Sequence, residues 1–356
     1  MNIVIHGAIN SSNFGDVLFA KMFYSACSDL PDSNVDFVQI PRFGVGNFVR
    51  KETGYKRVLS KMGYLKADKL VMMSGGYLGL SSTDLYSVVH LYARFIFPAR
   101  IYQFIKKPVY IIGVSGGPIE NKWLRKSVIK LIDHAEKVIV RDEETKDYLI
   151  QYGATNDIEV TADTALSIDK KRIPEIDDLA LRSFLQSRKT IFLHSEECAD
   201  LEVAKSIIPS LNLFLSNHPE YGIVFGYDYQ IDRSIKKSIC WDTISCEAKF
   251  AYEYKSVDQM LALLNNIDVI ITTKLHVGIL GSVFGKSVLA FPEMEEKTKN
   301  FYKQIGYSER CIPLSKINEE IVLYQLEKYY DKPIEINDEL IKRAQKNLAT
   351  IRQLER

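Results

Sequence analysis

The sequence predicts an α/β protein built from two Rossmann-like domains, and three features of the chain support this. Short apolar runs that suit buried strands alternate with helical patterns through the first half. A polar stretch at residues 166–189, which includes Pro174, separates this half from a second alternating set that begins at Thr190. A chain of 356 residues also exceeds what a single core usually supports.

The first half, residues 1–168, is expected to form the N-terminal domain. Its strand candidates are residues 3–5, 35–38, 70–73, 109–112 and 138–140. Helical patterns lie between most of them, at residues 17–28, 87–104, 122–134 and 143–152. Such alternation is typical of a doubly wound parallel sheet.

Residues 187–314 are expected to form the C-terminal domain, which would face the first across a cleft. Strands are predicted at residues 190–194, 222–226, 269–272 and 287–291, and helices at residues 201–214 and 257–265. Residues 315–356 contain two more helical patterns, 317–329 and 335–353. These C-terminal helices would brace the second domain or cross back to the first.

Composition argues against several classes of protein. The 46 Lys and Arg residues balance 45 Asp and Glu residues, so no bulk attraction to nucleic acid is expected. Five cysteines at irregular spacing form no C-x-x-C pair, which favours reduced thiols and argues against a structural metal site. Met1 leads directly into a strand pattern rather than a signal peptide, so we expect a cytoplasmic protein.

The most apolar long segment, residues 85–105, bears on contact with a membrane. His90, Arg94 and Arg100 interrupt it and would make a membrane-spanning helix costly. Its aromatic residues lie among basic ones, a mixture that suits peripheral contact with the inner face of a membrane. An amphipathic helix packed on the sheet is the alternative, and we favour it.

Residues 267–285 are the most informative stretch for function. A β-branched apolar run brings Lys274 and His276 to the carboxyl end of a predicted strand, where open α/β sheets bind ligands. The helix that follows contains Gly278, Gly281 and Gly285, which are poor helix formers, so close approach of a neighbour or a ligand is expected. The alternative is a core histidine beside a partly buried lysine.

The loop after the first strand, residues 6–16, is a second candidate site. It fits neither G-x-G-x-x-G nor G-x-x-x-x-G-K-[ST], so a nicotinamide or nucleoside triphosphate role has little support. The loop precedes a helix, and Asn13 or Asp16 would serve there as a cap, a base or a hydrogen-bond partner.

Two later segments repeat this pattern of a strand followed by glycines. Gly75 and Gly76 follow one predicted strand, and Gly116 lies in the segment after another. We expect both segments to be loops whose backbone amides line the site. Arg141 ends a further strand and would bind a carboxylate or phosphate, or form a salt bridge with the acids that follow it. Asp163 would face the cleft or hold a hinge.

Taken in order, these residues resemble the polysaccharide pyruvyl transferase family. The resemblance extends to about Tyr307 and rests on His6-Gly7, Asn13-x-Gly15-Asp16, Gly75-Gly76, residues 113–118, Arg141, Asp163, Leu275-His276 and Gly285. It implies a GT-B-like fold and transfer of the carboxyvinyl unit of phosphoenolpyruvate to a sugar of a bacterial-type polysaccharide or its lipid-linked precursor. The products would be a pyruvate ketal and phosphate, with no cofactor beyond the donor substrate.

The resemblance also implies individual roles. Arg141 and His276 match family positions, and Lys297 is the expected match for a donor-site lysine, with Lys299 as the alternative. Lys274 stands where arginine is usual, and the glycine-rich segment has two glycines in place of three.

These roles define a hypothesis for the mechanism. Arg141, Lys274 and Lys297 would bind the anionic donor. His276 would act as general acid or base, with Asp16 as a second candidate on the acceptor side. A GT-B glycosyltransferase using a nucleotide sugar, with Glu293 or Glu295 on the ribose, is one rival, and a non-catalytic sugar-binding protein is the other.

Overall fold

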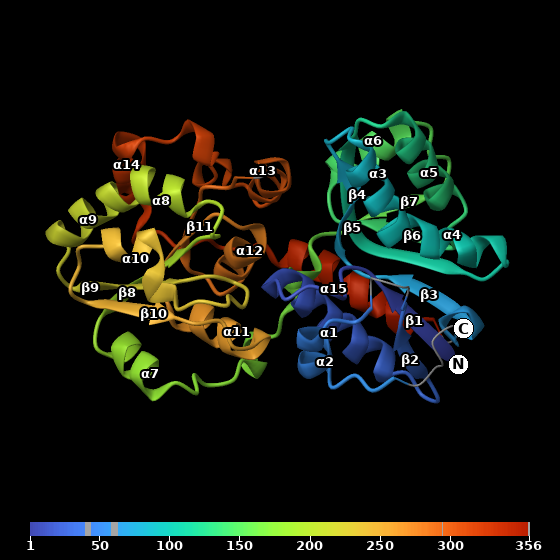
Figure 1. Cartoon of the computed structure of the whole chain (residues 1–356), viewed down its shortest axis with the longest axis horizontal. Helices are drawn as coiled ribbons and strands as arrows, with labels where there is room; N and C mark the ends of the chain where they lie inside the picture. The colour runs from blue at the N-terminus through green and yellow to red at the C-terminus, as the bar shows by residue number, and fades with distance from the viewer. Residues whose placement is uncertain (40–43, 58–62, 294, 355–356) are drawn as a thin grey trace. The chain divides into compact units, whose positions relative to one another are not determined.

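The computed structural model describes residues 1–39, 44–57, 63–293 and 295–354. Contacts divide the chain into two compact units. The first unit comprises Met1–Ser12, Asp16–Ser167 and Asp338–Arg356, and the second comprises Asn13–Gly15 and Ile168–Asn337. Each unit contains a parallel sheet with helices packed around it (Figure 1), which confirms the predicted α/β class.

The sheet of the first unit has seven strands in the order β2-β1-β3-β5-β6-β7, with β4 also paired to β5. The strands are β1 (Asn2–His6), β2 (Asn34–Phe37), β3 (Lys69–Met72), β4 (Gly75–Leu80), β5 (Val109–Ile119), β6 (Lys137–Val140) and β7 (Ile158–Val160). Ile3, Val4 and Ile5 are all fully buried. Burial on both faces explains why the central strands are continuous apolar runs.

Helices of the first unit are α1 (Phe14–Ser28), α2 (Asn47–Thr53), α3 (Leu85–Leu91), α4 (Phe97–Phe104), α5 (Lys122–Asp133) and α6 (Glu143–Gln151). A π-helical turn, η2 (Tyr92–Ile96), joins α3 to α4. Asp84, Asn121 and Asp142 accept hydrogen bonds from backbone N–H groups at the starts of α3, α5 and α6. These caps explain where the three helices begin.

Two glycine-rich segments predicted to be loops are strands, so that expectation was wrong. Gly75 and Gly76 begin β4, and Gly116 lies within β5. The two strands pair in parallel with shifts of register between Gly75 and Leu80. A Cβ on Gly116 would lie 2.3 Å from the carbonyl oxygen of Leu78. The glycines therefore permit close approach of two strands rather than the turns of a loop.

The second unit has a five-stranded parallel sheet in the order β10-β9-β8-β11-β12. Its strands are β8 (Lys189–His194), β9 (Tyr221–Gly226), β10 (Lys249–Tyr252), β11 (Val269–Thr272) and β12 (Ser287–Ala290). The helices around it are α7 (Leu179–Gln186), α8 (Asp200–Ser206), α9 (Ile208–Asn217), α10 (Ile239–Thr243), α11 (Val257–Asn266), α12 (Leu275–Val283), α13 (Glu295–Gln304) and α14 (Glu319–Tyr329).

One long helix predicted over residues 201–214 is interrupted. It divides into α8 and α9 at Ile207, and Pro209 lies in the first turn of α9. Proline tolerates that position because its missing N–H would have no partner in a first turn. The polar stretch at residues 166–189 also contains a helix, α7, which Asp178 caps.

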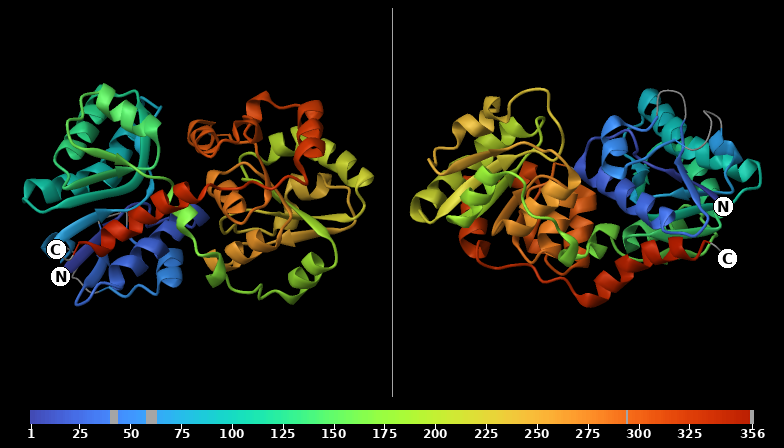
Figure 2. Two further views of the ribbon diagram at one scale, coloured as in Figure 1. Left: turned by 180° about the vertical axis from the view of Figure 1, so that it is seen from behind. Right: turned by 90° about the horizontal axis from the view of Figure 1, so that it is seen from below.

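The two C-terminal helices belong to different units. α14 belongs to the second unit and packs against α9, whereas α15 (Asp338–Arg352) belongs to the first. Figure 2 shows α15, in red, alongside the elements of the first unit. Fully buried Asn347 on α15 accepts a hydrogen bond from Thr161 Oγ1 at 2.7 Å and donates to the carbonyl oxygen of Ala162 at 2.9 Å. Among the described residues, no helix has the length and apolar content that crossing a bilayer requires.

Candidate active site

The carboxyl ends of three neighbouring strands in the second unit bring polar side chains together. β8 pairs with both β9 and β11, and all three run parallel. β8 ends at His194, β11 ends at Thr272, and Asp228 follows β9 by two residues. Parallel strands end at one edge of a sheet, so residues far apart in sequence meet there.

Lys274, which was predicted to bind an anionic substrate, is held by two carboxylates. Its Nζ lies 2.9 Å from Asp228 Oδ1 and 2.9 Å from Glu196 Oε1. Burial alone would lower the pKa of Lys274, but the charges of Asp228 and Glu196 outweigh it and raise this pKa above its usual value. The lysine is therefore a fixed cation whose single charge faces two carboxylates of the same unit.

Asp228 is the centre of this charge network. Burial favours its neutral form, yet the hydrogen bond with His194 and the charge of Lys274 lower the pKa of Asp228 to about 2. His194 Nε2 lies 3.5 Å from Asp228 Oδ1, and His194 Nδ1 lies 3.0 Å from Thr272 Oγ1. Asp228 thus stays ionised and fixes the side chains of both His194 and Lys274.

His276 lies in the first turn of α12, directly after β11. Lys274 is the N-cap residue, and no side chain caps this helix start. The positive end of a helix dipole and its first backbone N–H groups favour an anion at such a place. The predicted position of His276, at the end of a strand where a small-residue helix begins, is therefore confirmed.

Gly15 lies directly against His276. A Cβ on Gly15 would come within 2.0 Å of His276 Nδ1, so any larger residue would displace the ring. The same segment is tied down by a 3.1 Å hydrogen bond from Gly15 N to Asn13 Oδ1 and a 2.8 Å bond from Phe14 N to the carbonyl oxygen of Asp228. The Asn13-x-Gly15 motif and His276 therefore meet within the second unit.

The glycines of α12 are explained by neighbouring side chains. A Cβ on Gly278 would lie 2.7 Å from the hydroxyl oxygen of Tyr302, and one on Gly281 would lie 2.5 Å from a methyl carbon of Ile270. Gly285 follows the helix with a φ of +69°, a conformation that favours glycine. The sequence predicted close approach of either a neighbour or a ligand at these glycines. At Gly278 and Gly281 the close approach is that of a neighbouring side chain.

Lys297 and Lys299 both lie on α13. They flank Thr298, which is buried, while both lysines are partly exposed. Residues two apart on a helix do not share a face, so the two lysines leave α13 in different directions.

In the first unit, Asp16 acts on two residues that the sequence analysis did not select. Burial lowers the pKa of Arg94, and the charge of Asp16 opposes that effect. Burial also raises the pKa of Tyr77, and Asp16 raises it further. Arg94 hydrogen-bonds Asn10, and the hydroxyl of Tyr77 accepts a hydrogen bond from the backbone N–H of Ala8 at 3.1 Å.

Arg141, which was expected to bind a carboxylate or phosphate, forms an ion pair with Asp163, which was expected to face the cleft or hold a hinge. Arg141 Nη1 donates to Asp163 Oδ2 at 2.8 Å, and Arg141 Nε lies 3.7 Å from Asp142 Oδ2. Arg141 and Asp163 are 5% and 2% exposed. The salt bridge that the sequence allowed for Arg141 is present, and its nearer partner is Asp163 rather than the acids that directly follow Arg141.

His194 and Asp228 could have been found by the rule that identified His276. Each lies at or just beyond the carboxyl end of a strand. The segments that follow their strands do not contain the glycines that drew attention to residues 267–285. Arg94 and Tyr77 carry no such signal, because their relation to Asp16 arises only from folding.

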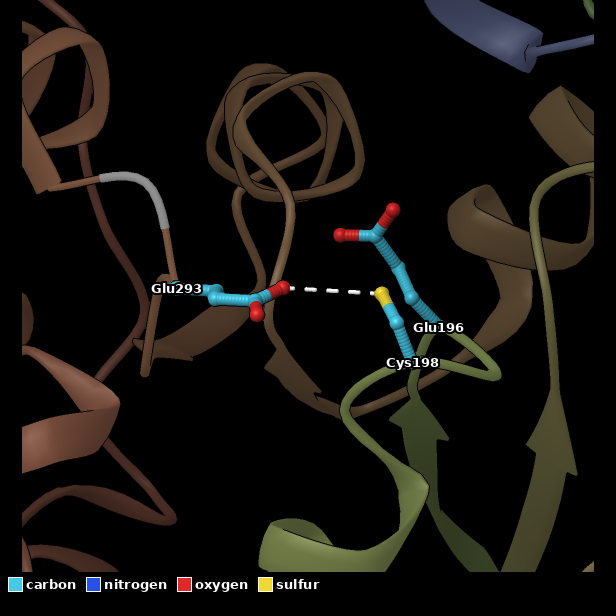
Figure 3. A group of neighbouring side chains, drawn as sticks. All are labelled: Glu196, Cys198 and Glu293. Atoms are coloured by element: carbon cyan, nitrogen blue, oxygen red, sulfur yellow. Dashed lines mark hydrogen bonds between the residues drawn. The ribbon is translucent and has the colours of Figure 1, made fainter. Parts of the chain in front are cut away.

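Glu196, Cys198 and Glu293 form a small cluster beside this network (Figure 3). Their ligand atoms lie within 4.8 Å of one another, and Cys198 Sγ donates to Glu293 Oε2 at 3.5 Å. Partial burial and the two carboxylates raise the pKa of Cys198. The cluster thus holds a neutral thiol between two carboxylates.

Similar folds occur among solved structures of sugar-nucleotide epimerases. The UDP-GlcNAc 2-epimerase of Methanocaldococcus jannaschii, in complex with UDP-GlcNAc and UDP, is 13% identical with a TM-score of 0.60, and 98% of each chain is covered. A putative UDP-N-acetylglucosamine 2-epimerase from Listeria monocytogenes is 12% identical with a TM-score of 0.64, covering 99% of this chain and 95% of its own. These likenesses show that the fold is GT-B-like.

No curated protein matches the chain by sequence. The model of the polysaccharide pyruvyl transferase family, however, matches residues 13–293. The matched range includes Asn13, Asp16, Arg141 and His276 and ends before Lys297. Because the match spans most of both units, the chain belongs to the polysaccharide pyruvyl transferase family.

Proposed function

We propose that this protein transfers the carboxyvinyl unit of phosphoenolpyruvate to a sugar of a polysaccharide or of its lipid-linked precursor. The product is a cyclic pyruvate ketal, and inorganic phosphate is released. The observation that carries the proposal is His276 in the first turn of α12, whose start no side chain caps. Membership of the family supports the reaction class.

The donor site is proposed at the start of α12. Phosphoenolpyruvate is small and strongly anionic, and a helix N-terminus favours such a ligand. Lys274 adds hydrogen-bond donors, but the two carboxylates of Asp228 and Glu196 more than offset its single charge. A further cation is therefore required, and we assign this role to Lys297, with Lys299 as the alternative.

The chemistry assigned to His276 is proton transfer. The oxygen of a sugar hydroxyl attacks C2 of the donor, the hydroxyl proton passes to a base, and C3 takes up a proton to become a methyl group. Attack of a second hydroxyl on C2 then closes the ketal as phosphate leaves with the C2–O bond electrons, and the proton of this hydroxyl passes to a base. His276 is the proposed acid or base, because an imidazole titrates near neutral pH.

Residues of the first unit are proposed to serve the acceptor. Asp16 is the second candidate base, and its neighbours Arg94 and Tyr77 offer hydrogen-bond donors to a sugar. Asn13, Gly75, Gly76 and Gly116 remain proposed substrate contacts through their amide or backbone groups. Because Arg141 and Asp163 form an ion pair with each other, we assign Arg141 a structural role at the site. Arg141 would bind substrate directly only if a ligand displaced Asp163.

Transfer from a nucleotide sugar is the alternative reaction, and one observation favours it. The structural relative from Methanocaldococcus jannaschii is in complex with UDP-GlcNAc and UDP. Glu293, which hydrogen-bonds Cys198, would then hold the ribose. A non-catalytic sugar-binding role is the third reading.

Calorimetry with phosphoenolpyruvate and, separately, with UDP-GlcNAc tests these readings on the full chain. We expect heat with phosphoenolpyruvate alone, reduced at high salt. Phosphate release is then followed with a panel of synthetic sugars and lipid-linked saccharides. Binding of UDP-GlcNAc without phosphoenolpyruvate would overturn the proposal, and binding of oligosaccharides with neither donor would support the non-catalytic reading.

A further inference from the structure

One surface of the first unit exposes large apolar side chains along a helix. Residues 85–104 form one continuous helical segment through α3, η2 and α4 (Figure 1). Leu85 is 77% exposed, Tyr86 79% and Phe104 87%. Soluble proteins expose single apolar residues routinely, but a cluster of this size indicates a binding surface.

These side chains share one face. Tyr86, Val89, Phe97 and Phe104 are separated by three, eight and seven residues, the spacing of one helical stripe. Other residues of the segment, Val88, Ile96 and Tyr102, are buried in the core. The helix therefore packs on the unit as the sequence analysis favoured, and it also presents an apolar face outward.

Trp123 on α5 extends this face. Tyr92 lies between the two elements, with its ring centre 4.6 Å from that of Trp123 and 6.1 Å from that of Phe97. Trp123 itself is 51% exposed. We call this surface the α3–α5 face and define it by Leu85, Tyr86, Val89, Phe97, Phe104, Ile105 and Trp123.

Basic residues outnumber acidic ones around the α3–α5 face. Residues 84–133 contain eight Lys and Arg residues and three acidic residues, Asp84, Glu120 and Asp133. The basic residues are Arg94, Arg100, Lys106, Lys107, Lys122, Arg125, Lys126 and Lys130. The whole chain has a formal charge of only +1, so this excess is local.

Two of these lysines are placed to act with the apolar residues. Lys126 and Lys130 follow Trp123 by three and seven residues on α5, so they share its face, and both are exposed. The hydrogen-bond acceptors of Arg100, Lys107 and Arg125 are neutral, being backbone carbonyls and the side chain of Gln103. The positive charge is therefore available to an anionic partner.

We propose that the α3–α5 face binds the surface of a bilayer that contains anionic lipids. Apolar and aromatic side chains would enter the headgroup boundary, and the lysines would attract lipid phosphates. A protein partner would require complementary acidic groups, whereas a bilayer supplies both an apolar layer and negative charge in one surface. This inference does not depend on which reaction the protein catalyses.

Vesicle flotation with the full chain tests the proposal. We expect binding to vesicles of phosphatidylcholine and phosphatidylglycerol, weaker binding at high salt, and little binding to phosphatidylcholine alone. Combining Lys122→Glu, Lys126→Glu and Lys130→Glu should weaken binding by about 100-fold or more, because each lysine near such a surface contributes severalfold. Combining Tyr86→Ser, Phe97→Ser and Phe104→Ser should weaken it by at least roughly tenfold.

Matched controls come from the second unit. Leu179, Leu201 and Tyr324 are 72%, 54% and 57% exposed, so their triple change to serine removes comparable apolar surface. Reversing the charges of exposed Lys205, Lys236 and Lys237 matches the other variant. Neither control should change binding by more than about twofold, since surface changes away from an interface have small effects.

Two outcomes would overturn the proposal. One is equal loss of vesicle binding in the controls, which would make the attraction non-specific. The other is a dimer in analytical ultracentrifugation that becomes monomeric when the α3–α5 face is changed, with no vesicle binding by the unchanged chain. Unchanged thermal unfolding of every variant would show that the comparison concerns binding and not folding.

Discussion

Arg141 and Asp163 form a buried ion pair, with 2.8 Å between Nη1 and Oδ2. Asp163→Asn removes the nearer counter-charge of a buried guanidinium, and Asp142 Oδ2 lies farther away, 3.7 Å from Arg141 Nε. We expect Asp163→Asn to lower the free energy of unfolding by about 3 kcal/mol. Denaturant unfolding followed by circular dichroism measures this change.

An exposed pair provides the control for Asp163→Asn. Arg172 and Asp169 lie 3.3 Å apart with side chains that are 87% and 52% exposed. Asp169→Asn should change stability by less than about 1 kcal/mol, because water screens such a pair. If Arg141→Lys leaves stability intact but abolishes phosphoenolpyruvate binding, Arg141 contacts the donor and is not mainly structural.

His276→Ala should reduce turnover by a factor of roughly 100 to 10,000, the range for a positioned acid or base. His276 is partly exposed at the start of α12, so little core packing is lost. Steady-state kinetics and thermal unfolding separate the two effects. A variant that unfolds, or one that keeps full activity, would assign His276 a structural role only.

Gly15→Ala should disturb His276 directly. Alanine is the better helix former by about 1 kcal/mol, so an isolated helix would gain stability from this change. The new Cβ would instead meet His276 Nδ1 at 2.0 Å. We expect a loss of about 1–3 kcal/mol, typical of overpacking.

A double-mutant cycle checks the cause of that loss. Gly15→Ala combined with His276→Ala should recover most of the stability, because the clashing ring is gone. Gly44→Ala is a control, since a Cβ at Gly44 has no atom within 4 Å. Additive losses in the double variant would contradict the contact.

His6 predicts how stability depends on pH. Burial lowers the pKa of His6 from 6.5 to about 4. Between these values the unfolded chain binds a proton that the folded chain does not, so this contribution is complete above pH 6.5 and is lost as pH falls toward 4. The loss amounts to about 3 kcal/mol.

Denaturant titrations from pH 7 to pH 4 measure this loss. His6→Gln, which cannot titrate, should show a flatter dependence than the unchanged chain. His134 is exposed at the end of α5, so His134→Gln should leave the slope as it was. A slope that is the same with and without His6 would show that other groups dominate.

Regular strands were predictable because the sheets are buried on both faces. The β11 prediction of residues 269–272 agrees with the strand Val269–Thr272, since an apolar run ended by polar residues marks both its limits. β4 could not be predicted, because its glycines read as turn residues. Only its irregular pairing with β5 reveals why glycine is required there.

The position of His276 followed from local pattern, whereas the partners of the charged groups did not. A strand end followed by a small-residue helix is a local signal. The bonds of Lys274 to Asp228 and Glu196 join residues from three separate strand ends. A single sequence does not show which residues meet in the folded protein, so it could not identify the partners of Lys274.

The position of α15 determines the order in which the units are completed during synthesis. Asn347 fills hydrogen bonds of Thr161 and Ala162, so the first unit acquires these contacts only after the whole second unit has left the ribosome. Domains generally fold in order from the N-terminus. Here the second unit can complete its folding first. Until α15 is synthesised, the surface of the first unit that α15 covers stays exposed, and chaperones can bind it.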